Sequence, residues 1–291
     1  MLYIPRGPIM DYQNQDLVTF VIGSLKKIAK QHKALFVKFD PSLFLSNQKN
    51  GQEKTEASDV EAVITALTKQ GVEWTGPTKD MAENIQPRFQ ANIHKEFFTE
   101  QNLSKSTRQA IRTARNKGIQ VQFGGTELLE DFASLMKKTE ARKSIHLRGR
   151  DYYEKLLTTY QGQSYITLYT LDLEARKTSL VQDLEKNQAE AEKFTEKTKP
   201  GKIENNQKEK ERLEEELQFL EEHLQAGLRT VPLSGTLTLE FGGTSENVYA
   251  GMDEEFRRYQ PAILTWYETA QHAFDRGASW QNMGGIENSL D

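Results

Sequence analysis

The stretch EARKTSLVQDLEKNQAEAEKFTEKTKPGKIENNQKEKERLEEELQFLEEHLQAGL, residues 174–228, predicts two long helices folded back on each other. Apolar residues recur at alternating spacings of three and four in both halves, which is the period of a coiled-coil seam. Pro200 and Gly201 separate the halves, because proline cannot continue a helix and glycine tolerates the positive φ of a helix end. We therefore expect an antiparallel coiled-coil arm in which Leu184 faces Leu217.

The arm interrupts a pair of predicted strands. Residues 165–171 before it and residues 233–241 after it are both rich in β-branched and aromatic residues. The arm therefore takes the place of a hairpin turn. Asn187, Lys177 and Lys210 are polar positions of its seam, which weaken the helix pair but fix its register.

Charge is distributed unevenly along the arm. Its tip holds four lysines against Glu196 alone, whereas glutamates crowd the second helix. A basic tip on an acidic stalk suits an anionic partner such as RNA. A solvated spacer or a dimerisation element is the alternative that applies to any coiled coil. The tip lysines are Lys193, Lys197, Lys199 and Lys202.

Composition restricts the class of protein. The 291 residues are 36% hydrophobic, and the mean hydropathy of -0.70 indicates a soluble chain with room for two modest domains beside the arm. We find no apolar run of membrane-spanning length and no secretory signal, and expect a cytoplasmic protein. Because the chain has no cysteine and five scattered histidines, neither disulfides nor a metal site is expected. The net charge of -4 excludes only a broadly basic nucleic-acid binder.

The first part of the chain alternates strands and helices, which indicates an α/β domain. A strand at residues 2–4 precedes a helix at about residues 14–31, and a buried strand at residues 34–39 ends at Asp40. The apolar positions expected to face inward on that helix are Leu17, Phe20, Val21, Leu25 and Ile28. Catalytic groups often lie at the end of a strand in α/β sheets, so Asp40 is a candidate. Alternatively, Asp40 only starts a turn before proline.

A short helix at residues 104–117 is the most basic part of the chain and contains no acidic residue. Four cations on it are three or four residues apart and form one stripe, which could meet several phosphates at once. A basic surface helix without a partner is the alternative. The stripe consists of Lys105, Arg108, Arg112 and Arg115.

The second domain is expected to begin at about residue 143. Arg148 and Tyr152 are four residues apart at the start of a helix, so a guanidinium and a phenol could reach one anion. After the arm come two strands, a helix with Ala262, Ile263, Trp266 and Ala270 inward, and a last strand, in the order of an acetyltransferase-like module. Residues 257–262 (RRYQPA) replace the glycine-rich loop that would bind a pyrophosphate, which argues against coenzyme A.

Five short segments together resemble the Fem aminoacyltransferases, and the MurM and MurN branch of that family in particular. The resemblance spans nearly the whole chain, in the family's order and at suitable distances. The segments are YIPRGPI at 3–9, KFDP at 38–41, QPR at 86–88, YAG at 249–251 and GGIE at 284–287.

This resemblance implies an α/β (α+β) fold of two acetyltransferase (GNAT)-like domains, residues 1–142 and 143–291, with the coiled-coil arm at 174–228 inserted in the second. Family members transfer an amino acid from aminoacyl-tRNA to the stem-peptide lysine of lipid II, or of UDP-MurNAc-pentapeptide, and need no cofactor. The arm would then contact tRNA, and the protein would work at the inner face of the plasma membrane. Members also carry further segments before and after the region matched here, which implies a chain incomplete at both ends.

Residue by residue, the resemblance implies that Asp40 lies in the catalytic cleft. It also implies that Arg148, Tyr152 and Tyr249 hold the diphosphate or sugar of the cell-wall precursor. The chemistry would be aminolysis of an ester, which requires an oriented amine, an oxyanion donor and a proton for the leaving ribose oxygen. Because an exposed aspartate has a pKa about six units below that of a lysine ammonium, Asp40 is expected to orient the amine rather than deprotonate it.

Two other functions are compatible with the residues. An acyl-CoA-dependent N-acyltransferase is the enzymatic alternative, against which the sequence of residues 257–262 counts. A non-catalytic protein that binds RNA or dimerises through its arm is the other.

Overall fold

The computed structural model describes residues 1–43, 45–47, 55–56, 59–78 and 85–286 of a mixed α/β chain. The chain forms two compact units: unit 1 contains residues 1–90 and 285–291, and unit 2 contains residues 91–284. The expected boundary between residues 142 and 143 lies inside unit 2, and as a division into domains it stays a prediction. Glu287 of the GGIE segment lies outside the described residues.

Unit 1 is built on a parallel pair of strands, in which Ile4 of β1 is opposite Phe39 of β2. Strands β3 and β4 form a separate antiparallel pair. Helix α1 begins after Asn14, whose side chain accepts a hydrogen bond from the backbone N–H of Leu17 and so caps the helix. The elements are β1 (Leu2–Ile4), α1 (Gln15–Gln31), β2 (Val37–Phe39), β3 (Ser46–Asn47), β4 (Thr55–Glu56) and α2 (Val60–Lys69).

The face of α1 that turns inward differs from the expected one. Val18, Ile22 and Ala29 are buried, whereas Phe20 is 71% exposed and Ile28 is also exposed. Leu25 packs against the buried cluster as predicted, but the rest of the prediction was wrong because two apolar stripes run along this helix, and α2 packs on the one that contains Val18 and Ile22. The periodicity alone does not say which of two stripes meets a neighbour.

Unit 2 is organised around a six-stranded sheet in the order β5-β10-β9-β8-β7-β6. Strands β6 to β9 pair antiparallel, and β9 and β10 pair parallel. The strands are β5 (Gln90–His94), β6 (Gln120–Gly124), β7 (Ser164–Asp172), β8 (Thr230–Phe241), β9 (Thr244–Met252) and β10 (Trp280–Gly285). The helices are η2 (Lys95–Phe97), η3 (Glu100–Asn102), α3 (Lys105–Asn116), η4 (Thr126–Leu128), α4 (Leu129–Lys143), α5 (Arg150–Thr159), α6 (Leu173–Ala191), α7 (Pro200–Gln225), η5 (Glu254–Tyr259) and α8 (Pro261–Asp275).

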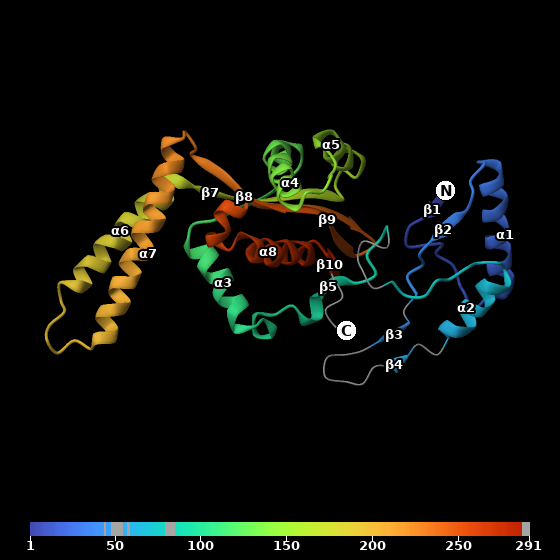
Figure 1. Ribbon diagram of the computed structural model, residues 1–291, viewed down its shortest axis with the longest axis horizontal. Helices are drawn as coiled ribbons and strands as arrows, with labels where there is room; N and C mark the ends of the chain where they lie inside the picture. Colours follow the sequence, from blue (N-terminus) through green and yellow to red (C-terminus); the bar gives the residue numbers. More distant parts are fainter. Residues whose placement is uncertain (44, 48–54, 57–58, 79–84, 287–291) are drawn as a thin grey trace. The chain divides into compact units, whose positions relative to one another are not determined.

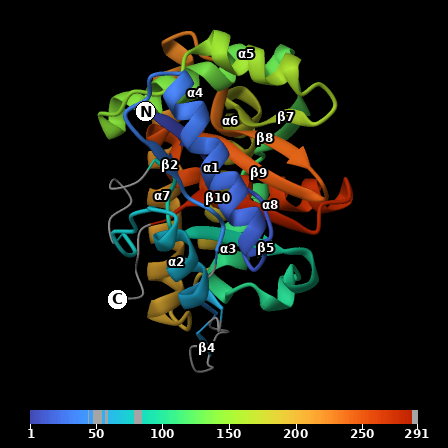
Figure 2. The ribbon, with the colours of Figure 1, turned by 90° about the vertical axis from the view of Figure 1, so that its right-hand side faces the viewer.

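Helices cover both faces of this sheet, with α4 and α5 on one face and α3 and α8 on the other (Figure 1 and Figure 2). Successive residues of a strand point to opposite faces. On β7, Ile166 and Leu168 accordingly pack with Phe132 of α4 and Tyr153 of α5, whereas Tyr169 packs with the helices of the other face. The two faces of the sheet therefore provide two separate surroundings for functional groups.

The sheet face under α8 is polar. The Thr238 hydroxyl donates to the side-chain oxygen of Asn247 at 2.8 Å, and Gln281 donates to the same oxygen at 2.7 Å. Helix α8 turns the buried Thr265 and Thr269 toward this face. Of the residues expected to face inward on α8, Ala270 is buried, whereas Ala262, Ile263 and Trp266 are only half-buried. The buried side of the helix includes Thr265 and Thr269, which suit a polar sheet face.

Helices α6 and α7 leave the sheet between β7 and β8 and run antiparallel to each other (Figure 1). Leu180, Leu213 and Leu220 are buried between them and the body of unit 2. Further toward the tip, Asn187 and Asn206 each donate a side-chain N–H to the backbone carbonyl of the other, at 3.0 and 3.1 Å. This reciprocal pair holds one alignment of the two helices.

The root of this helical pair belongs to the main core of unit 2. Its leucines share one cluster with Leu171, Val231, Phe256 and Tyr259 of the body. Two helices that packed only against each other would make no such contact with the body. The root is therefore packed on the sheet end and on η5.

A buried ion pair lies at the same root. Arg176 Nε donates to Glu216 Oε1 at 2.8 Å, and the two side chains are only 6% and 3% exposed. Lys117, which follows α3, places its Nζ 3.5 Å from Glu216 Oε2 and also donates to the backbone carbonyl of Arg258. Burial raises the pKa of Glu216, but the hydrogen bond from Arg176 and the charge of Lys117 outweigh it, so the pKa lies below its ordinary value. Glu216 therefore connects α6, α7 and the end of α3.

We predict that Glu216→Gln lowers the free energy of unfolding by about 3–5 kcal/mol, because it leaves the buried Arg176 without a counter-charge. The matched control is Glu215→Gln, which removes the same charge from an exposed position one residue away. Urea unfolding followed by circular dichroism measures both variants. Equal stabilities of the two variants would show that the ion pair does not hold the root.

Candidate functional site

Asp40 lies at the end of β2 in unit 1, and both of its carboxylate oxygens accept hydrogen bonds. The Tyr3 hydroxyl donates to Oδ2 at 2.5 Å, and the backbone N–H of Arg6 donates to Oδ1 at 2.6 Å. Burial and this contact with Asp40 raise the pKa of Tyr3. Asp40 thus ties β2 to the residues that follow β1. A carboxylate oxygen can accept two hydrogen bonds, so the contacts leave acceptor capacity for an ammonium group.

Arg148, Tyr152 and Tyr249 lie together on the α4 and α5 face of the sheet in unit 2. The Arg148 guanidinium carbon is 5.3 Å from the centre of the Tyr152 ring. The rings of Tyr152 and Tyr249 are 6.2 Å apart and nearly perpendicular, at 81°. These residues come from the loop before α5, from α5 and from β9, so the fold joins positions about a hundred residues apart.

Sequence reasoning missed a fourth member of this group, Tyr153. Its ring lies 5.0 Å from that of Tyr249, and its buried hydroxyl has no hydrogen-bond partner among the described residues. Burial raises the pKa of Tyr153 to about 12, with a smaller contribution from Tyr249. Tyr153 directly follows Tyr152 and therefore points about 100° away around the helix. Its position does not fit the four-residue spacing that connected Arg148 with Tyr152, so the sequence pattern did not predict it.

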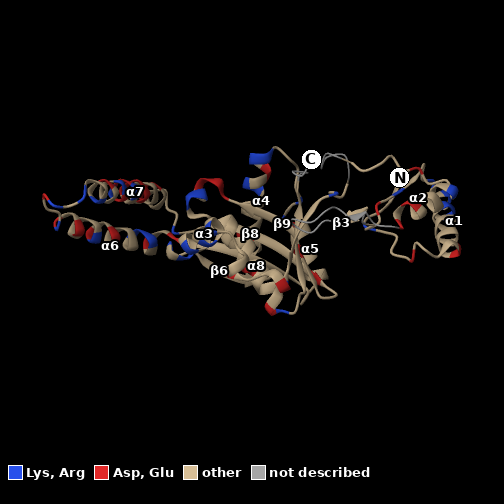
Figure 3. Ribbon diagram, turned by 90° about the horizontal axis from the view of Figure 1, so that it is seen from below, with Lys and Arg blue, Asp and Glu red and all other residues tan. Residues whose placement is uncertain are grey.

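The electrostatics of this group suit an anion. Burial and the neighbouring Tyr152 raise the pKa of Tyr249, although Arg148 opposes the shift. Tyr249 is therefore a neutral hydrogen-bond donor at neutral pH. Arg148 forms no ion pair with a carboxylate of the described residues, whereas Arg150 two positions later pairs with Glu130. Figure 3 shows how the charged residues are distributed along the chain. A guanidinium without a carboxylate partner and neighbouring phenols can together bind a diphosphate.

The structure divides the basic stripe of α3 into two kinds of cation. Arg108 donates to the backbone carbonyls of Glu100 and Leu103, each at 2.9 Å, and Arg115 forms a 2.6 Å ion pair with Glu268. Lys105 and Arg112 are exposed and have no ion-pair partner in the described part of the chain. The stripe is thus partly anchored to the protein and partly open to a ligand.

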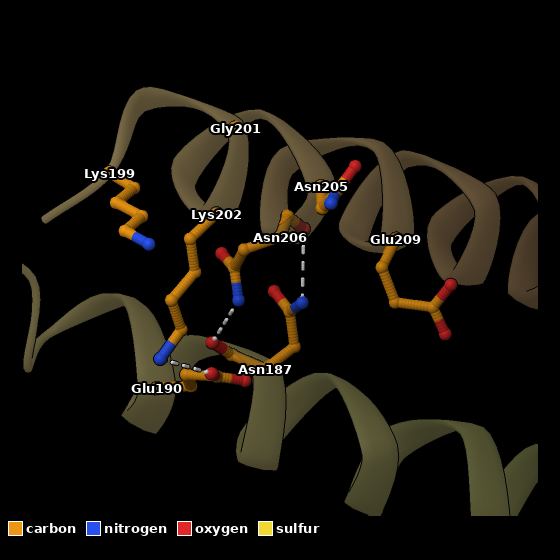
Figure 4. Close-up of a pocket in the computed structure, with 8 residues that line it drawn as sticks. All are labelled: Asn187, Glu190, Lys199, Gly201, Lys202, Asn205, Asn206 and Glu209. Carbon is orange, nitrogen blue, oxygen red and sulfur yellow. Dashed lines mark hydrogen bonds and ion pairs between the residues drawn. The ribbon is translucent and has the colours of Figure 1, made fainter.

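The tip lysines also differ from one another. Lys193, Lys197 and Lys199 are exposed, whereas Lys202 pairs with Glu190 of α6 at 3.0 Å. Figure 4 shows this pair beside the reciprocal contact of Asn187 and Asn206. These residues and Lys199 line a groove of about 580 Å³ between the helices.

The predicted site residues therefore fall into four places. Asp40 is in unit 1, and the other three places are in unit 2. They are the α3 stripe, the arm tip and the Arg148 group, which consists of Arg148, Tyr152, Tyr153 and Tyr249. The prediction that Asp40 faces the Arg148 group across two domains stays a prediction. No group of three or more His, Cys, Asp or Glu side chains suited to a metal ion occurs among the described residues.

Comparison with known proteins identifies relatives over the whole chain. A family model described as the FemAB family matches residues 1–291. The lipid II:glycine glycyltransferase of Staphylococcus epidermidis RP62A is 25% identical over 304 residues, and that of Staphylococcus aureus USA300 is 26% identical over 309 residues. Each match covers 100% of this chain and 70% of the relative. The crystal structure of FemX superposes with a TM-score of 0.68 at 25% identity, over 99% of this chain and 73% of FemX.

We predict that Arg148→Lys weakens binding of a diphosphate ligand by roughly 1–3 kcal/mol, because lysine keeps the charge but loses the planar pair of donors. Isothermal titration with inorganic pyrophosphate measures the change. Arg142→Lys, on α4 beside Glu254, is the control for an arginine outside the group. An Arg148→Lys protein that binds pyrophosphate as tightly as the control would remove Arg148 from the candidate site.

Proposed function

The chain belongs to the FemAB family, and we propose that it is an aminoacyltransferase of peptidoglycan synthesis. It takes an amino acid from aminoacyl-tRNA and attaches it to the stem-peptide lysine of lipid II or UDP-MurNAc-pentapeptide. The product is the interpeptide branch. The observation that carries this proposal is the match of all residues 1–291 to a family whose curated relatives are lipid II:glycine glycyltransferases.

In this proposal the Arg148 group holds the precursor. The guanidinium of Arg148 contacts the diphosphate, and the hydroxyls of Tyr152 and Tyr249 complete its surroundings or contact the sugar. The observed proximity of the three side chains and the absence of an ion-pair partner for Arg148 among the described residues support this assignment. Tyr153 supports the ring of Tyr249 from inside the unit.

The reaction is the aminolysis of an ester. The lysine amine forms a bond to the aminoacyl carbonyl carbon, the bond from that carbon to the ribose oxygen breaks, and the proton lost by nitrogen is returned to the leaving oxygen. Asp40 holds the incoming lysine nitrogen through the acceptor capacity that Tyr3 and Arg6 leave; the ammonium form first loses its extra proton to solvent, and the neutral amine then attacks. Alignment of amine and ester is the main contribution of such a site, because the ester is already activated.

The architecture proposed for this activity has two acetyltransferase-like domains and a coiled-coil arm formed by α6 and α7. The tip lysines and the α3 stripe contact the phosphates of tRNA. Residues 257–262 replace a pyrophosphate-binding loop: Tyr259 is buried there, as is Phe256 just before it, and Pro261 lacks an N–H at the start of α8. This counts against an acyl-CoA donor.

The substrate lipid II places the reaction at the inner face of the plasma membrane, where we propose that the protein binds peripherally from the cytoplasm. Within the described residues, none of the helices combines the length and apolar character needed to cross a bilayer.

The proposed function is tested by product formation. The protein is incubated with lipid II and a set of charged tRNAs, and mass spectrometry of the product is expected to show one added amino acid with at least one tRNA. Samples with uncharged tRNA, or with acyl-CoA as the only donor, are the controls. Addition from acyl-CoA would establish the alternative enzyme, and tRNA binding without any product would establish a non-catalytic RNA-binding protein.

We predict that changing Lys193, Lys197, Lys199 and Lys202 together to Gln weakens tRNA binding and flattens its salt dependence. The log–log slope should fall by about 2, because each phosphate contact contributes roughly 0.7 and Lys202 is already paired with Glu190. Fluorescence anisotropy of labelled tRNA between low and moderate salt measures the slope. The control replaces Lys186 and Lys208, which pair with carboxylates of their own helices. An unchanged slope in the tip variant would exclude the tip from RNA binding.

A further inference from the structure

A small pocket lies beside α3, away from the Arg148 group. Its volume is about 130 Å³. Three of its residues, Arg108, Arg112 and Arg115, are four and then three positions apart and therefore project from one side of the helix. The remaining lining residues are Glu100, Leu103, Ile111 and Asn116.

Two of these arginines are held in place by the protein. Arg108 donates through Nη1 to the carbonyls of Glu100 and Leu103, and Arg115 donates through Nε and Nη2 to Glu268. The Arg115 guanidinium also lies 5.4 Å from the centre of the Tyr267 ring. A guanidinium has five N–H donors, so both arginines keep donors for a ligand while their positions are fixed.

Arg112 differs from its two neighbours, because it is exposed and has no ion-pair partner among the described residues. The pocket thus contains two anchored guanidinium groups and one available one. The carboxylates of Glu100 and Glu268 reduce the positive charge, and one net positive charge remains. That charge matches the single negative charge of a phosphodiester.

The pocket has a volume of about 130 Å³, which is enough room for one phosphate group.

The position of α3 indicates which phosphate this is. Helix α3 packs with α8 on the sheet face opposite α4 and α5, so the pocket and the Arg148 group lie on different faces. The next cation along the chain, Lys117, contacts Glu216 at the root of α6 and α7. A long polyanion that lies along α3 and the arm root can reach the pocket, whereas a precursor bound at the Arg148 group would be on the other side of the sheet.

We propose that the pocket of Arg108, Arg112 and Arg115 binds one backbone phosphate of the tRNA, which lies along α3 and the root of the α6–α7 arm. The two substrates thus approach unit 2 from opposite faces of its sheet. This assignment rests on the proposed use of aminoacyl-tRNA. Arg112 captures the phosphate, and the anchored Arg108 and Arg115 fix its position.

The test compares Arg112→Gln with Lys137→Gln, which removes an exposed cation from α4 on the opposite face. Anisotropy of labelled tRNA is measured from 0.05 to 0.3 M salt. Arg112→Gln is expected to lower the affinity about fivefold at 0.1 M salt and the log–log slope by about 0.7, as the loss of one phosphate contact requires. Lys137→Gln should leave both unchanged, and Arg112→Lys should restore the slope. Thermal unfolding verifies that the variants are folded.

A parallel experiment measures binding to phosphatidylcholine vesicles that contain lipid II. Equal tRNA affinities for the Gln variants at 112 and 137 would overturn the pocket assignment while leaving the transferase proposal intact. Weaker vesicle binding by Arg112→Gln, with unchanged tRNA binding, would overturn it in favour of the precursor's phosphates. A wild-type protein that binds no tRNA in this salt range would refute both the pocket assignment and the tRNA-dependent function.

Discussion

The buried contact of Glu216 with Arg176 determines how the arm is attached to unit 2. Two charges in the interior are stabilised only when each has its partner, so α6 and α7 are held at one register where these residues meet. Lys117 adds the end of α3 to the same carboxylate, and the ring of Tyr259 lies 4.8 Å below its ammonium group. Burial lowers the pKa of Lys117, and Glu216 opposes that shift. The end of the basic helix and the root of the arm therefore meet at one buried carboxylate.

Most of the fold could be predicted from local sequence patterns. The order of strands and helices, the strand pair around the arm and the reversal at Pro200 all follow from periodicity and turn chemistry, and β7, β8 and α7 lie where these patterns place them. The inward faces of α1 and α8 were predicted only in part: Leu25 and Ala270 face inward, but the other buried positions differ because tertiary partners decide between stripes. Thr265 and Thr269 of α8 are buried against a polar sheet face, and a prediction based on apolar periodicity does not include them.

The candidate site was less predictable than the fold. Arg148 and Tyr152 have helical spacing, but only the resemblance to a family connected them with Tyr249, which the folded sheet places beside them. Helical spacing grouped Arg108, Arg112 and Arg115, which line one pocket. It could not show that Arg108 is bonded to backbone carbonyls and Arg115 to Glu268. Likewise, Glu216 is one of many glutamates on α7, and its burial depends on where Lys117 and Arg176 lie in space.

The claim that the arm root belongs to the core of unit 2 is tested most directly by native-state hydrogen exchange of the α7 amides. The account predicts that the amides around Leu213–Leu220 have the same free energy of opening as the amides of β7 and β8, because the side chains of both belong to one cluster. Amides near Asn206 should exchange more readily. If all amides of α7 instead exchange together, at a free energy well below that of the sheet, the arm is an independent element and the account is wrong.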